Sequence, residues 1–285
     1  MSNGRVVTAY LLFTVVTAAV LWLIFNHWIA AAIGAGFAVL WWIIASIFGD
    51  AILLRTLRAS ELNVSMYPEV GKLATTSLRI GPRIGPPKLM YIATHSPMLM
   101  SIGLSRRSAC LVFTKGFFDY LEDKPQIGLM KREVESIRSG ATAANTGLAT
   151  LLWIILAPGR IATVATGKPP GEPNTLSLIL NIVPAFFLAS IIGLIGFDRT
   201  AVHRVDAATL SKLENPDYLP YALMKLQEAL LAAPFDVDLA LGPCCVVSPN
   251  NRDTLQNLFK LHPTTPKRID RLRIRAKAAR RILNK

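Results

Sequence analysis

The sequence is poor in charge, in acidic residues and in cysteine. Charged residues make up only 17% of its 285 residues, whereas soluble domains carry about a quarter. The hydrophobic content of 52% excludes a disordered polyelectrolyte, and only three cysteines in so long a chain exclude a disulfide scaffold. What is present is long apolar sequence and basic residues, with 31 Lys and Arg against 18 Asp and Glu. We therefore expect an integral membrane protein with a basic water-facing part.

Four apolar stretches are candidates for membrane spans. Val6–Phe25 and Ala30–Phe48 carry no charge and approach the roughly 20 residues that cross a bilayer, so they predict a helical hairpin turning at 26–28. Leu176–Gly196 predicts a further span. Thr142–Ala157 has small, polar first turns, so it is either a span or a buried or re-entrant helix. About four transmembrane helices are expected.

The basic residues predict how these spans are oriented. Four spans place both termini and the long segment 51–140 on one face. Of the 31 Lys and Arg, all except Arg160 and Lys168 lie on that face. The positive-inside rule therefore predicts that the N- and C-termini are cytoplasmic and that the protein lies in the plasma membrane.

The water-facing part comes in two pieces separated by the last two spans. Short strands are predicted at 88–93 and 109–113 from their apolar and β-branched content, and helices elsewhere. The expected fold is mainly α, with a cytoplasmic α+β part built on a small sheet. The division of the chain is 1–50 for the transmembrane hairpin, 51–140 for the first cytoplasmic part, 141–196 for the third and fourth spans, and 197–285 for the second cytoplasmic part with a basic C-terminal helix. The helices are predicted at 64–78, 123–138, 199–213, 216–231, 252–261 and from 266 onward.

The order of these parts resembles the HtpX family of membrane-embedded zinc metallopeptidases, which are related to the CAAX prenyl proteases. The resemblance rests on that order, on the segment THSPMLMSIGLSRRSACLVFTKGFF at 94–118 and on LFKLHPTTPKRIDRLR at 258–273. It covers essentially the whole chain. It implies a metallopeptidase-like cytoplasmic domain that contributes its catalytic residues from two helices.

The zinc helix of that family carries H-E-x-x-H, whose two histidines bind the metal and whose glutamate acts as general base. In this chain Arg132 and Ser136 stand at the histidine positions, and Glu133 matches the base. A guanidinium has no lone pair to give to a metal, and serine is a poor ligand. The resemblance therefore implies a helix that has lost two zinc ligands.

The third ligand of the family is the glutamate of an E-x-x-x-D motif after the last span. Here Val202 occupies that position, and Asp206 matches the second carboxylate. With all three ligands replaced, we expect no zinc or other cofactor, no catalytic residues and no peptidase activity. The expected vestigial cleft consists of Arg132, Glu133, Ser136, Val202, Asp206 and His262, where His262 belongs to the family's His-Pro motif and is expected to be structural.

A cation would still be needed to compensate the carboxylates left behind by a lost metal ion. Arg132 can supply it, so we expect Arg132 within salt-bridge distance of Asp206. Two alternatives stay open. Arg132, Glu133 and Glu135 can be ordinary solvated helix charges, or His203 can join Glu133 and Asp206 in a rearranged metal site.

Two hypotheses for function follow. The first is a catalytically inactive pseudoprotease that serves as a membrane-anchored binding or scaffold subunit of a membrane protein complex. The second is a membrane metalloendopeptidase with a rearranged metal site, acting in membrane protein quality control. For the first hypothesis, the resemblance implies a peptide-binding strand edge, formed by Leu99, Met100, Ser101 and Ile102, that can hold a peptide or partner segment without cutting it.

The terminal segment Lys267–Lys285 holds nine basic residues and one acidic residue, and its apolar residues recur at helical spacing. It is either a helix that contacts anionic lipid or a last helix docked on the core. Nucleic acid is not an expected partner, because no aromatic residues interleave with the basic ones. The expected partners are the lipid bilayer and membrane proteins.

Overall fold

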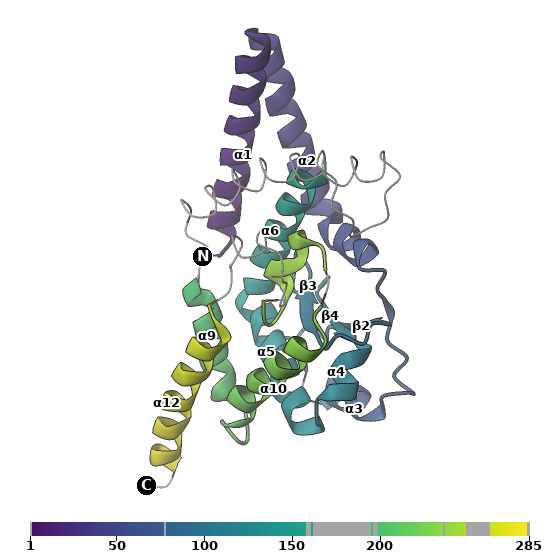
Figure 1. Cartoon of the computed structure of the whole chain (residues 1–285), viewed down its shortest axis with the longest axis vertical. Coiled ribbons are helices and arrows are strands. Elements are labelled where there is room, and N and C mark those ends of the chain that lie inside the picture. The colour runs from purple at the N-terminus through teal and green to yellow at the C-terminus, as the bar shows by residue number, and fades with distance from the viewer. Residues whose placement is uncertain are drawn as a thin grey trace.

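The computed structural model describes residues 2–76, 78–157, 161, 195, 199–235, 237–248 and 263–283. A long helical hairpin projects from one end of the molecule, and a small sheet covered by helices forms the other end (Figure 1). The predicted combination of mostly helix with one small sheet is confirmed.

The hairpin consists of α1 (Ser2–Phe25) and α2 (Trp28–Thr56). The turn is short because Asn26 takes a left-handed conformation with a φ of 48°, and the His27 side chain accepts a hydrogen bond from the amide of Ile29. Both helices are long and apolar enough to cross a membrane. Their apolar side chains are largely exposed, which suits contact with lipid rather than with water. The predicted hairpin is confirmed.

The helix at the predicted third span is shorter than a membrane is thick. Helix α6 (Ala141–Ile155) has 15 residues, or about 23 Å at 1.5 Å per residue, whereas the hydrocarbon core measures about 30 Å. It is buried along most of its length and contacts α1, α2 and β3. The buried-helix alternative therefore describes it better than a span. The predicted span Leu176–Gly196 lies outside the described residues apart from Ile195, so four spans are not confirmed.

The sheet has four strands in the order β1-β2-β4-β3. Strands β2 and β4 are parallel, and the two outer strands pair antiparallel with them. Strand β4 is entirely buried because it lies between two neighbours and is covered on both faces. The predicted strands 88–93 and 109–113 are confirmed. The strands are β1 (Ser60–Glu61), β2 (Lys88–Ile92), β3 (Leu99–Ile102) and β4 (Cys110–Thr114).

The helices of the water-facing part lie at or near their predicted positions. They are α3 (Pro68–Thr76), α4 (Lys115–Tyr120), α5 (Asp123–Ser139), α9 (Arg199–Leu210), α10 (Tyr218–Ala232) and α12 (Thr265–Leu283), with a short 3₁₀ helix, η1 (Leu239–Cys244). Helix α5 ends at Gly140, whose φ of 80° favours glycine and turns the chain directly into α6. The predicted helix 252–261 lies outside the described residues.

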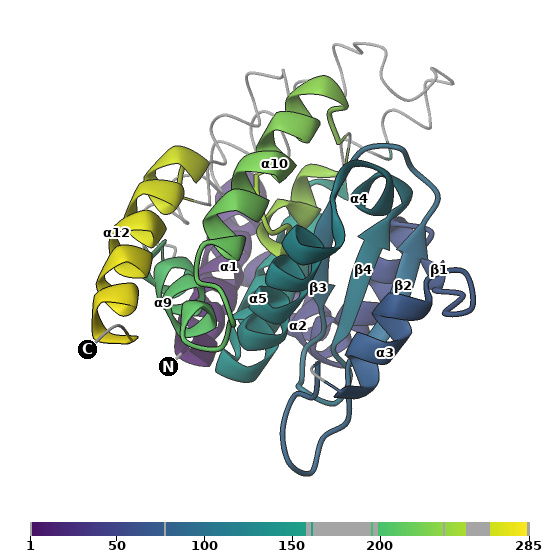
Figure 2. The same ribbon diagram turned by 90° about the horizontal axis from the view of Figure 1, so that it is seen from below.

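The helices are arranged so that α5 lies at the centre. Figure 2 shows the sheet on one side, α9 and α12 on the other, and α5 with α10 between them. Helix α12 contacts α9 and α10, and its residues Ile269, Leu272 and Ala276 are buried. The helix then runs away from the hairpin, so that the C-terminus lies at the opposite end of the molecule from the hairpin tip (Figure 1). The core-docked alternative for the terminal helix is therefore the one observed.

Candidate functional site

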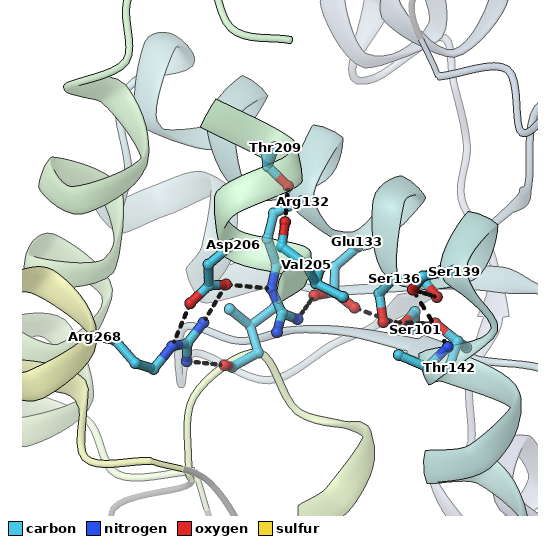
Figure 3. A network of polar contacts seen from close by, with 12 residues as sticks. Ser101, Arg132, Glu133, Ser136, Ser139, Thr142, Val205, Asp206, Thr209 and Arg268 are labelled. Atoms are coloured by element: carbon cyan, nitrogen blue, oxygen red, sulfur yellow. Dashed lines mark hydrogen bonds and ion pairs between the residues drawn. The ribbon is translucent and has the colours of Figure 1, made fainter. Parts of the chain in front are cut away.

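Four charged side chains meet in the interior where α5, α9 and α12 come together (Figure 3). Arg132 on α5 binds Asp206 on α9, with 3.1 Å between Arg132 Nε and Asp206 Oδ1, and also pairs with Glu133. The predicted Arg132–Asp206 ion pair is thus confirmed, and the alternative of solvated charges is wrong for Arg132 and Glu133. Arg132 is only 4% exposed, and Glu133 and Asp206 are each 1% exposed.

Arg268 on α12 is a second arginine at this centre. Its Nε and Nη2 atoms lie 2.9 Å and 3.0 Å from the two Asp206 oxygens, a bidentate pair. Two arginines and two carboxylates make the cluster neutral as a set, which is the condition under which charges can be buried. Burial by itself raises the pKa of Asp206, but Arg268 and Arg132 outweigh burial and hold that pKa below its ordinary value.

A chain of hydroxyl groups holds the other side of Glu133. The Ser101 hydroxyl on β3 donates to Glu133 Oε2 at 2.5 Å and lies 2.8 Å from the Thr142 hydroxyl on α6. Thr142 in turn lies 3.0 Å from Ser136 Oγ. Glu133 is therefore fixed from both sides, by a guanidinium and by a serine.

Glu135 faces away from this centre. Its carboxylate pairs with Lys212 and lies 3.5 Å from Arg138 Nη1. Lys212 is half exposed, so this pair belongs to the surface. The two neighbouring glutamates of α5 therefore have different surroundings, because they lie on different faces of the helix.

The residues at the three ligand positions do not fit a zinc ion. Arg132 offers no lone pair, Ser136 takes part in the hydroxyl chain, and Val202 is a buried valine one helical turn before Asp206. Both Asp206 oxygens are bound by arginine. The side chains at these positions therefore do not form a set of zinc ligands.

The rearranged set of His203, Glu133 and Asp206 is not assembled either. Within the described ranges, no three His, Cys, Asp or Glu side chains are grouped to hold a metal ion. Partial burial and then the nearby charge of Arg271 lower the pKa of His203. His262 lies outside the described residues.

The predicted peptide-binding edge is an outer strand of the sheet, as expected. Its residues Leu99, Met100, Ser101 and Ile102 are nevertheless at most 3% exposed. The main chain of Val246 donates a hydrogen bond to the Leu99 carbonyl at 3.1 Å, and Cys245 faces Met100 in an antiparallel bridge. A peptide can add to this edge only after that segment moves, so peptide binding stays a prediction.

Two site residues were not anticipated in their roles. Arg268 belongs to the motif His262-Pro263-x4-Arg268-Ile269, so its position in a quoted motif was a signal that it has a fixed partner. Ser101 was expected at the strand edge, but not as the hydrogen-bond partner of Glu133. Nothing in the local pattern around Ser101 or Thr142 pointed to that contact.

A membrane hairpin joined to a helix-and-sheet part, with a buried glutamate at the general-base position, defines a membrane-bound protease-like protein. Comparison with curated proteins shows which proteins the chain is similar to. The chain is 24% identical over 234 residues to the "Protease HtpX homolog" of Syntrophobacter fumaroxidans, covering 79% of this chain and 83% of the relative. It is 27% identical over 232 residues to that of Pyrococcus furiosus, covering 79% and 80%. It is 26% identical over 243 residues to "Protease HtpX" of Legionella pneumophila, covering 79% and 82%.

No family model matches the chain. The relatives nevertheless align over about four fifths of it, so the predicted resemblance to the HtpX family is confirmed. The expectation that the protein is not an enzyme is corrected by this finding, because the relatives are named proteases. Residues other than histidine at the ligand positions do not by themselves exclude hydrolysis by the remaining groups.

Proposed function

We propose that this protein is a membrane-bound endopeptidase of the HtpX type that acts on membrane proteins in their quality control, from a rearranged centre around Glu133. The names of the relatives support the activity. The observation that carries the proposal is the Glu133 carboxylate, buried at the general-base position and held by Arg132 and Ser101.

Glu133 is the group that can move protons in this centre. A carboxylate in this position accepts a proton from the attacking water and returns it to the leaving amine. Arg132 places a permanent positive charge beside it, and such a charge stabilises a developing oxyanion. We propose that this arrangement works without zinc, because Arg132 stands at a ligand position.

The proposal includes a placement in the cell. The hairpin α1–α2 spans the plasma membrane, and both termini face the cytoplasm, as the distribution of basic residues favours. Membrane proteins are then the partners, as substrates. Helix α12 runs away from the hairpin toward the far end of the molecule (Figure 1), which gives little support to the predicted contact with anionic lipid.

Proteolysis by the purified protein tests this proposal. The full chain in mild detergent is incubated with β-casein as an unfolded probe and with a detergent-solubilised membrane protein, and fragments are measured by mass spectrometry. We expect cleavage that survives a chelator and falls at least 100-fold in Glu133→Gln. The metal content of the same sample is expected to be well below one zinc per chain.

Glu135→Gln is the matched control, because it makes the same change two residues along the same helix and outside the centre. It is expected to retain cleavage. Absence of cleavage in the wild-type protein, or equal loss in both variants, contradicts the proposal. Stoichiometric zinc contradicts the metal-free centre only.

A further inference from the structure

Strand β3 is one of the two outer strands of the sheet, and its other side faces away from β4. An edge of this kind offers main-chain N–H and C=O groups that pair readily with another extended segment. In this chain the edge strand contacts the charged centre, because Ser101 on β3 hydrogen-bonds to Glu133.

Two residues of the same chain cover this edge, and we call Cys245–Val246 the strap. The Val246 amide donates to the Leu99 carbonyl at 3.1 Å, and Cys245 faces Met100 antiparallel. Cys245 has the backbone of an extended residue, with φ −73° and ψ 146°. Both strap side chains are buried, at 1% and 0% exposure. The strap therefore lies where an added peptide strand would lie.

The strap makes only a short pairing with the edge. It pairs with β3 as an isolated bridge, and the 3₁₀ helix η1 ends directly before it. A regular antiparallel strand of four or five residues would make several main-chain hydrogen bonds to the same edge. A longer extended segment can therefore outcompete the strap.

The strap is fastened by the centre itself. Arg268 Nη1 donates to the Val246 carbonyl at 2.7 Å, while the same guanidinium binds Asp206. Asp206 in turn binds Arg132, the partner of Glu133. The closed edge and the charged centre thus share one network, which Figure 3 shows from Arg268 to Ser101.

We propose that the strap closes the β3 edge in the resting protein and that an extended apolar polypeptide segment displaces it and pairs antiparallel with β3. The occupant is apolar because its side chains replace those of Cys245 and Val246, which fill buried space. This inference rests on the proposed function for the identity of the occupant as a substrate segment.

A reversible lock tests the proposal. Met100 and Cys245 lie opposite each other in the antiparallel bridge. The hydrogen bond runs between their neighbours, from the Val246 amide to the Leu99 carbonyl, so Met100 and Cys245 are a non-hydrogen-bonded pair. Such pairs have Cα atoms about 4.5 Å apart, within the roughly 4.4–6.8 Å that a disulfide spans. Met100→Cys, with Cys110→Ala and Cys244→Ala to remove competing thiols, can therefore be closed by oxidation and reopened by dithiothreitol.

The probe is a seven-residue peptide of alternating valine and threonine with a central photoreactive benzoylphenylalanine, added to the full chain in detergent. In the reduced variant we expect cross-links at residues 99–102, and in the oxidised variant at least tenfold fewer. Dithiothreitol is expected to restore them. In the control that adds Cys245→Ala, oxidation is expected to change nothing. Equal cross-linking of the oxidised and reduced forms overturns the proposal.

Val246→Pro opens the edge by a second route, in case the first variant does not fold. Proline removes the amide that binds Leu99, and the extended Cys245 is compatible with a following proline. Loss of one such hydrogen bond is expected to raise cross-linking roughly tenfold above wild type. A folded Val246→Pro protein that cross-links no better than wild type also overturns the proposal.

β-Casein cleavage, measured on the same preparations, separates the two proposals. Reversible cross-linking without cleavage refutes the proteolytic function and leaves the strap intact. Cleavage that is indifferent to the lock refutes the strap and leaves the proteolytic function intact.

Discussion

The hairpin and the charged centre distribute side chains in opposite ways. On the hairpin, large apolar side chains such as Leu23 and Trp28 are 71% and 72% exposed. At the centre, Arg132 and Asp206 are almost completely buried. Each arrangement is unfavourable in water, and each is stable for a different reason.

The hairpin is stable where its surroundings are apolar, because lipid replaces the water that its side chains would otherwise meet. The centre is stable because its charges compensate one another, each arginine facing at least one carboxylate. Hydropathy alone therefore explains the exposure of apolar side chains on the hairpin. It does not explain the burial of charges at the centre, which depends on the partner of each charge.

Removal of the shared carboxylate should have the largest effect. Asp206→Ala leaves Arg132 and Arg268 without the group that binds both. Breaking a buried pair from one side costs about 3–5 kcal/mol, and we expect a loss of this size in the free energy of unfolding in detergent. Asp270→Ala, on the exposed face of α12, is the control and should change little. A small loss in Asp206→Ala would mean that the centre is not compensated through this residue.

A charge on the hairpin should be the next most costly change. Leu40 lies near the middle of α2 and is exposed toward the expected lipid. Leu40→Arg brings a guanidinium there without a partner, at a cost of about 2.5–3.5 kcal/mol for insertion. The fraction of protein integrated into membranes after alkaline extraction measures this effect, with Leu40→Ala as the control. Full integration of Leu40→Arg would show that this face of α2 does not contact lipid.

Acid should weaken the centre by a smaller amount, because a protonated carboxyl still accepts hydrogen bonds. Arg268 and Arg132, acting against burial, hold the pKa of Asp206 below its ordinary value. A carboxyl with a depressed pKa stabilises the fold above its unfolded-state pKa and loses that contribution as the pH falls through the folded-state value. The unfolding free energy should therefore begin to fall below about pH 4. The free energy of unfolding is measured against pH for the wild type and for Asp206→Asn. The difference between the two proteins gives the contribution of the Asp206 charge, and this difference should become smaller in acid.

The surface pair should matter least. Glu135 lies on the face of α5 that points away from the centre, and it binds the half-exposed side chain of Lys212. Exposed pairs contribute about 0–1 kcal/mol, so Lys212→Ala should lower the free energy of unfolding by less than 1 kcal/mol, and added salt should shrink the difference. A loss comparable to that of Asp206→Ala would remove the distinction between the surface and the centre.

Much of the local structure could be predicted from the residues in order. The hairpin, strands β2 and β4 and helix α5 follow from runs and periods that a short window contains. Such a window left Thr142–Ala157 ambiguous, because a buried helix and a short membrane span have the same composition. The pairing of Arg132 with Asp206 could be predicted because the family resemblance supplied the register of two distant helices.

The sequence by itself determined the apolar hairpin, since a run of apolar residues depends only on residue type. The replacement of the zinc ligands stays a prediction, because the family resemblance supplied their positions. Tertiary structure decided that Arg268 shares Asp206, that Ser101 holds Glu133 and that the strap covers β3. Arg132 and Arg268 are 74 and 62 residues from Asp206 along the chain. Contacts over such separations are set by how helices and strands pack, and no local pattern records which charge will meet which.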